Sequence, residues 1–218
     1  MKIRLKGGLK MKALDLKLDK IKDEILKLHE MAKEAMSLCL DAMYGDEVKR
    51  EEVSEIEKEA DVLNTDVDND CLMAVALYQP VARDLRFVAS IMRMSANYER
   101  ITDLADKIAK FRVKKRIAED ELRLMQKTLL EMFDIVAHAL EGNTESLREK
   151  LVEKDDLLDD LYLKVIQTGK EAMKNQEDIN DALIAIFSAK HLERSGDILS
   201  KNGARIIFIE EGRRVWIK

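Results

Sequence analysis

Two short sequences that place a glutamate four residues before an aspartate are the first candidates for chemistry in this chain. Glu99 and Asp103 occur in Glu-Arg-Ile-Thr-Asp, and Glu193 and Asp197 occur in Glu-Arg-Ser-Gly-Asp. Side chains four residues apart lie on one face of a helix, where two carboxylates repel each other unless water screens them or a cation binds there. The spacing therefore favours either a solvated acidic face or a cation site.

Each of these pairs has a further acidic pair upstream. The pair Glu57/Asp61 lies 42 residues before the first, and the pair Asp155/Asp159 lies 38 residues before the second; with 43 Asp and Glu in 218 residues, only the repetition is informative. Consecutive helices joined by a short turn run antiparallel, so the two pairs of each half can meet side by side. Four carboxylates together suit a hard cation such as Mg, Mn, Ca or iron. The candidate metal ligands are Glu57, Asp61, Glu99, Asp103, Asp155, Asp159, Glu193 and Asp197.

The elements that must position these pairs are helices. Apolar residues recur with a helical period, and Gly45-Asp46, Pro80, Gly142-Asn143 and residues 175–178 interrupt it. The predicted helices are Leu14–Ala42, Glu47–Leu77, Val81–Val113, Glu119–Leu140, Thr144–Met173 and Ile179–Glu211, with Thr144 as an N-cap. Equivalent acidic pairs of the two halves are offset by 98 and 94 residues. The predicted fold is all-α, with two tandem, pseudo-symmetric three-helix bundles at residues 13–113 and 119–212.

The composition excludes some classes of protein and of site. Charged residues are 37% and aromatic residues 5% of the chain, as is typical of long helices, and the net charge of −5 argues against nucleic-acid binding. A basic N-terminal arm, residues 1–12, could contact anionic lipid or an acidic partner, or could be a solvated terminus. Cys39 and Cys71 lack metal-site spacing and are expected to be buried thiols. With no signal-peptide pattern and no long apolar run, we expect a cytoplasmic protein.

Other readings of the acidic pairs remain open. The three histidines form neither Glu-x-x-His nor His-Glu-x-x-His, which disfavours a ferritin-like di-iron core. The chain has no glycine-rich phosphate loop and no nucleophile motif, so we expect a protein that is not an enzyme. A structural helical scaffold without metal is one alternative. A metal-dependent hydrolase is another, but it lacks candidate catalytic groups beyond the carboxylates.

Three segments together resemble one protein family. Residues 78–86 read Tyr-Gln-Pro-Val-Ala-Arg-Asp-Leu-Arg, residues 99–108 read Glu-Arg-Ile-Thr-Asp-Leu-Ala-Asp-Lys-Ile, and residues 191–197 read His-Leu-Glu-Arg-Ser-Gly-Asp. This combination resembles the PhoU family of phosphate-uptake regulators. The second repeat departs from the first, because Ser200 stands at the place of Asp106 and Gly196 at the place of Thr102.

The resemblance implies a fold, a function and partners. It implies two three-helix bundles side by side, with multinuclear iron or zinc clusters bound by the eight carboxylates named above. It also implies a regulatory adaptor that restrains phosphate uptake and phosphate-starvation signalling. The implied partners are a subunit of a phosphate ABC transporter and a sensor histidine kinase. Homodimer formation and peripheral membrane association are further expectations.

Overall fold

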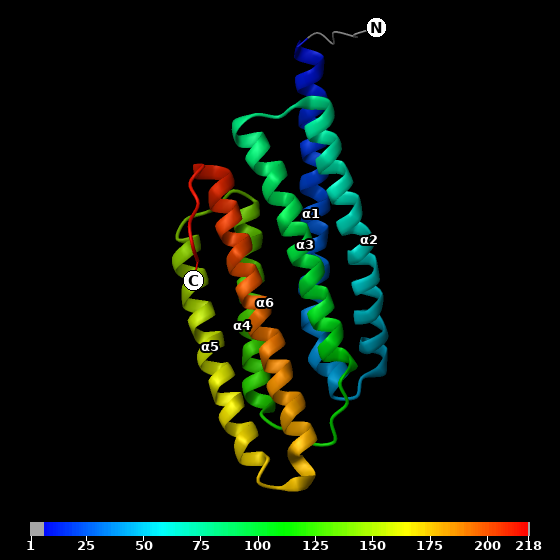
Figure 1. Ribbon diagram of the computed structural model, residues 1–218, viewed down its shortest axis with the longest axis vertical. Coiled ribbons are helices and arrows are strands. Elements are labelled where there is room, and N and C mark those ends of the chain that lie inside the picture. The colour runs from blue at the N-terminus through cyan, green and yellow to red at the C-terminus, as the bar shows by residue number, and fades with distance from the viewer. Residues whose placement is uncertain (1–6, 218) are drawn as a thin grey trace.

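A computed structural model describes residues 7–217 of the chain, and all regular elements in this range are helical (Figure 1). A short 3-10 turn, η1 (Gln176–Asp178), precedes the last helix. The helices are α1 (Gly7–Met43), α2 (Glu47–Tyr78), α3 (Ala82–Lys110), α4 (Glu119–Leu140), α5 (Leu147–Ala172) and α6 (Ile179–Glu211). The all-α prediction with six helices is confirmed within the described residues.

The six helices form two three-helix bundles that lie side by side. Helices α1, α2 and α3 pack on one another, as do α4, α5 and α6, and the bundles meet through α1 with α4 and α3 with α6. Helices α2 and α5 therefore lie at the two outer edges (Figure 1). Buried apolar side chains from all six helices form one continuous core. The tandem arrangement is as predicted, but the two bundles share their hydrophobic interior.

The helix ends differ from the sequence prediction by more than one residue at three places. Helix α1 begins at Gly7 rather than Leu14, so the predicted basic arm is partly helical, and residues 1–6 lie outside the described residues. Helix α3 ends at Lys110 because Phe111 is extended. The predicted N-cap Thr144 is wrong: its carbonyl oxygen accepts a turn hydrogen bond from Leu147, and Ser146, with a φ of 53°, directly precedes α5. The limits of the two repeats stay a prediction.

The beginning of α3, just after the turn that follows α2, contacts the second bundle at one end. Gln79 ends α2 in the left-handed conformation, with a φ of 54°, and Pro80 follows it. Arg86 then donates hydrogen bonds from Nε to the carbonyl oxygen of Phe208 at 3.1 Å and from Nη2 to that of Ile209 at 2.9 Å. The last carbonyl groups of a helix have no partner within it, so Arg86 satisfies the end of α6. Arg86, the last residue of the Gln-Pro…Asp-Leu-Arg sequence, therefore has a structural role.

Buried polar contacts tie the bundles together along the rest of their interface. The Asn97 amide on α3 donates to Oδ1 of Asn202 on α6 at 2.6 Å. The Gln126 amide on α4 donates to the carbonyl oxygen of Met36 on α1 at 2.8 Å. An unpaired buried polar group costs free energy, so such hydrogen bonds favour one alignment of the helices over others.

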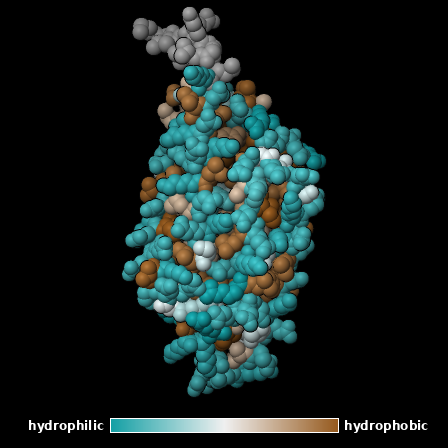
Figure 2. All heavy atoms as spheres, turned by 180° about the vertical axis from the view of Figure 1, so that it is seen from behind, coloured by the Kyte–Doolittle hydropathy of each residue, from teal (hydrophilic) through white to brown (hydrophobic). Residues whose placement is uncertain are grey.

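The outer surface is mostly hydrophilic. Figure 2 shows separate hydrophobic patches within a hydrophilic surface on the face opposite to that of Figure 1. None of the described helices is both long and apolar enough to span a membrane.

Both thiols are expected to be unreactive in the folded protein. Cys39 and Cys71 are free, fully buried cysteines, as predicted, and burial raises the pKa of each thiol to about 12. The nucleophilic thiolate is therefore scarce near neutral pH. We expect a chromogenic disulfide reagent to label neither cysteine in native protein and both after unfolding in guanidinium. Rapid labelling of the native chain would contradict this burial.

Candidate functional site

Helices α2 and α3 bring the first four predicted ligands together. The Ser95 hydroxyl donates to Oδ1 of Asn64 at 2.7 Å, which sets the register of this antiparallel pair. One helical turn farther along, the same register places Asp61 opposite Glu99 and Glu57 opposite Asp103. The two acidic pairs therefore share one face, as the sequence predicts.

The electrostatics of Glu99 reflect this grouping of carboxylates. Partial burial raises the pKa of the Glu99 carboxyl, and the neighbouring charges of Asp103, Asp61 and Glu57 raise it further. Both effects disfavour the charged form. A positive charge placed beside Glu99 would therefore be favourable.

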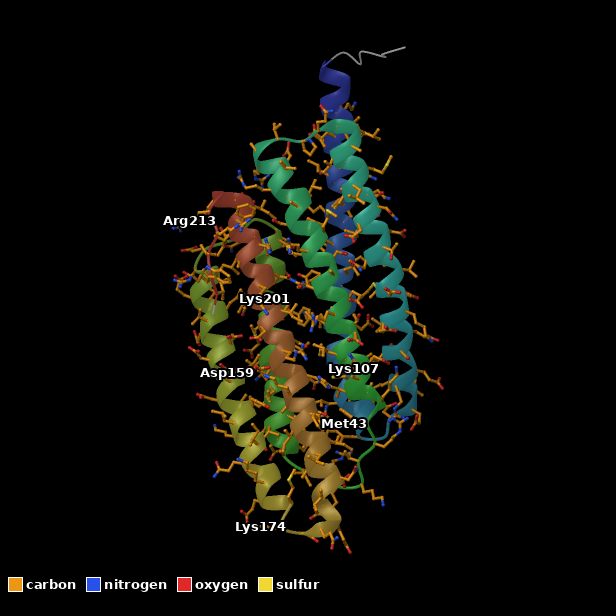
Figure 3. The ribbon with its side chains drawn as sticks, viewed as in Figure 1. Met43, Lys107, Asp159, Lys174, Lys201 and Arg213 are labelled. Atoms are coloured by element: carbon orange, nitrogen blue, oxygen red, sulfur yellow. The ribbon has the colours of Figure 1, made fainter. Side chains whose placement is uncertain are left out.

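A lysine already supplies positive charge to the first site. Nζ of Lys107 lies 2.6 Å from Oδ2 of Asp103 within α3, and Lys107 is labelled in Figure 3. The side chains are 51% and 37% exposed, so solvent screens this pair and its contribution to stability is small. A metal ion that bound Oδ2 of Asp103 would have to displace Lys107.

The second site is built where α5 and α6 approach each other closely. A Cβ atom at Gly196 would lie 2.4 Å from Cδ1 of Leu158 and 3.8 Å from Oδ1 of Asp155. The Ser200 hydroxyl also donates to Oδ1 of Asp155 at 3.4 Å. These contacts set residues 155–159 alongside residues 196–200. The glycine in Glu-Arg-Ser-Gly-Asp therefore permits the approach of the two helices.

The four second-site carboxylates differ in their surroundings. Asp155 is buried, whereas Asp159 and Asp197 are partly exposed, and Asp159 is labelled on α5 in Figure 3. Glu193 lies on the same helix as Asp197, one helical turn earlier in the chain. Its Oε1 pairs with Lys190 at 2.7 Å, and its Oε2 is buried without a hydrogen-bond partner. Each site thus has a lysine on one of its carboxylates.

The donor set fits a hard metal ion in chemistry, but the side chains are not drawn together around one point. Carboxylate oxygens are the ligands that such ions prefer, and the unpartnered Oε2 of Glu193 is a free acceptor of this kind. Among the described residues, no three His, Cys, Asp or Glu side chains are grouped closely enough to hold a metal ion. Metal binding would therefore require the carboxylates to change rotamer.

Two further polar side chains lie beside the first site. Asp106 is 4% exposed, pairs with Lys110 and has a buried Oδ1 without a hydrogen-bond partner. Asp106 lies outside the predicted ligand set because it follows Asp103 by three residues, whereas the prediction rests on acidic pairs four residues apart. His191 on α6 stacks on Phe111, with ring centroids 6.3 Å apart. Burial lowers the pKa of His191, which fits a structural role.

Comparison with known proteins gives consistent matches. A family model described as the PhoU domain matches the chain twice, at residues 25–111 and 122–206. The phosphate-specific transport system accessory protein PhoU homolog of Archaeoglobus fulgidus is 42% identical over 207 residues, which cover 95% of this chain and 100% of that protein. The Escherichia coli protein of the same description, PhoU, is 26% identical over 83% of this chain and 78% of its own length.

Two solved structures share the fold. The phosphate transport system regulatory protein PhoU from Streptococcus pneumoniae superposes with a TM-score of 0.80 and 27% identity, covering 93% of this chain and 99% of that one. PhoU from Pseudomonas aeruginosa superposes with a TM-score of 0.83 at 21% identity, covering 91% and 99%, and this match bears on the fold alone.

Proposed function

Because this chain belongs to the PhoU family, we propose that it is a regulatory accessory protein of phosphate-specific transport. The observation that carries the proposal is the pair of PhoU-domain matches, one in each bundle, together with the relative that aligns over its entire length. In this role the protein restrains phosphate uptake and phosphate-starvation signalling. It is an adaptor and not an enzyme.

The proposed partners follow from that role. The protein acts in the cytoplasm on a subunit of a phosphate ABC transporter and, where one is present, on a sensor histidine kinase. Its contact with the membrane is peripheral, and it forms a homodimer. The description of the relatives as transport-system accessory proteins supports the transporter as the first partner to test.

The proposed metal sites are the two carboxylate groups described above. Glu57, Asp61, Glu99 and Asp103 would hold one cluster, and Asp155, Asp159, Glu193 and Asp197 the other, with iron as the first candidate and zinc as the second. Bound metal would supply positive charge that joins α2 to α3 and α5 to α6. The mutual repulsion at Glu99 and the unpartnered Oε2 of Glu193 support this assignment.

Phosphate uptake in cells tests the regulatory role directly. We expect deletion of the gene to raise the uptake of radiolabelled phosphate in phosphate-replete medium, and the intact chain supplied in trans to restore the lower rate. The tagged chain should also co-purify with the nucleotide-binding subunit of the phosphate transporter. Unchanged uptake together with no co-purification would contradict the proposal, and metal-dependent phosphatase turnover would favour the hydrolase alternative.

A further inference from the structure

A concave basic pocket lies between α3, α6 and the C-terminal tail. Its volume is about 280 Å3, and its charged lining residues are Arg93 from α3, Lys201 and Arg205 from α6, and Arg214 from the tail. Phe208 and Trp216 provide aromatic walls, and Trp216 is 85% exposed. None of the described residues that line it is acidic. Figure 3 labels Lys201 on α6 and Arg213 at the start of the tail.

The positive charges of this basic pocket have no carboxylate partners among the described residues. Two other arginines are paired with carboxylates: Arg83 lies 2.6 Å from Glu210, and Arg123 lies 2.5 Å from Asp41. An uncompensated positive cluster is unexpected in a chain of net charge −5. Burial and the charges of Arg93 and Arg214 lower the pKa of half-buried Arg205, as expected where neighbouring cations repel one another.

The dipole of α6 does not account for the cluster. Cations stabilise a helix C-terminus only within its last turn. Lys201 and Arg205 lie ten and six residues before the end of α6 at Glu211, beyond that turn. The carbonyl oxygens near that end already accept hydrogen bonds from Arg86.

Specific contacts hold the tail that completes the pocket. Gly212 ends α6 with a φ of 73°, which turns the chain back along the helix. Ile217 is 3% exposed, and its Cδ1 would lie 3.4 Å from a Cβ atom at Gly203, so it packs directly on α6. Nε of Arg148 donates to the carbonyl oxygen of Trp216 at 3.3 Å. These contacts hold the tail in place, so that Arg214 lines the same pocket as Arg205 before any ligand binds. A site that is already ordered lowers the entropic cost of binding a ligand.

We propose that the basic pocket binds the phosphate group of a small anionic ligand. Guanidinium groups match the oxygens of a phosphate with paired hydrogen bonds, and three of them, from α3, α6 and the tail, surround one cavity. A bound phosphate would offset the repulsion among these cations. The pocket shares no residue with the acidic pairs, and its binding of phosphate does not depend on the proposed role in transport, so it can be tested independently of both.

Calorimetric titration of the full chain with inorganic phosphate, at constant ionic strength, tests the proposal. We expect saturable binding that weakens about tenfold or more when one guanidinium is removed, since hydrogen bonds to charged groups are among the strongest. Arg205→Gln is the first variant. Arg93→Gln, at an exposed position, is the second, so a folding defect in one variant does not decide the result. Arg213→Gln is the matched control, because Arg213 lies in the same tail, pairs with Glu211 and does not line the pocket.

The phosphate group of a lipid is the competing source of the same chemistry. A second titration therefore uses vesicles of phosphatidylcholine with phosphatidylglycerol and follows the emission of Trp216, the single tryptophan of the chain. Binding of inorganic phosphate that is lost in Arg205→Gln and Arg93→Gln but kept in Arg213→Gln supports the proposal. No phosphate binding, equal weakening by all three substitutions, or a vesicle-induced blue shift without phosphate binding overturns it.

Discussion

Iron or zinc is expected to raise the free energy of unfolding of the intact protein by about 2.7 kcal/mol when the metal is in hundredfold excess over its dissociation constant. The reason is that a ligand bound only by the folded state stabilises that state. In the protein stripped with chelator the same carboxylates repel one another, and both burial and the neighbouring carboxylates disfavour the charged form of Glu99.

The substitution Glu99→Gln separates the two readings of the acidic face. Without metal it relieves repulsion, so it should stabilise the protein by a few tenths of a kcal/mol. With metal it removes a charged ligand, so it should reduce the stabilisation that metal provides. Glu99 is a cleaner position than Asp103, because Asp103→Asn would also break the ion pair with Lys107.

The measurement is denaturant unfolding of each variant with chelator and with metal. Glu55→Gln is the matched control, since Glu55 is an exposed carboxylate on α2 outside the proposed ligand set. A metal-dependent gain that shrinks in Glu99→Gln but not in Glu55→Gln supports the site. Equal stability with and without metal in all three proteins would contradict the metal site and support a solvated acidic face.

Acidification is expected to destabilise the protein through His29. This side chain is fully buried, and its Nδ1 shares a 3.0 Å hydrogen bond with the hydroxyl of Tyr98. Burial, and to a lesser extent the charge of Lys33, lowers its pKa from 6.5 to about 4, although Asp134 opposes the shift. The folded state binds a proton at His29 less readily than the unfolded chain does. The contribution of His29 to the free energy of unfolding is therefore present above about pH 6.5 and is lost as the pH falls toward about 4.

The expected loss is about 2 kcal/mol between about pH 7 and about pH 5, from a pKa difference of about 2.5 units between the unfolded and folded chain. Urea unfolding of wild type and His29→Gln over this range measures it. The variant should be much less pH-dependent, with a residual slope from His191, whose pKa burial also lowers. His138→Gln, at an exposed histidine, should keep the wild-type slope. An unchanged slope in His29→Gln would contradict the role of His29.

The helices and the faces of the acidic pairs were predictable from the sequence. The helical period of apolar residues is a local pattern, and residues such as Pro80 and Gly142 interrupt it locally. All six helices are therefore predicted, and most predicted helix ends lie within three residues of the observed ones. The exception is the start of α1 at Gly7, because the basic residues before Leu14 favour an arm over a helix in the sequence prediction. Carboxylates four residues apart share a face by helix geometry alone, and the turn at Pro80 predicted the meeting of Glu57/Asp61 with Glu99/Asp103.

What surrounds those carboxylates was decided by tertiary structure. The contacts of Lys107 with Asp103 and of Lys190 with Glu193 depend on rotamers, which neighbouring side chains select. The basic pocket gathers residues from α3, α6 and the tail across more than 100 positions of sequence. Local periodicity indicates which face of a helix is apolar. It does not indicate which distant helix covers that face, because this depends on the packing of the shared core as a whole.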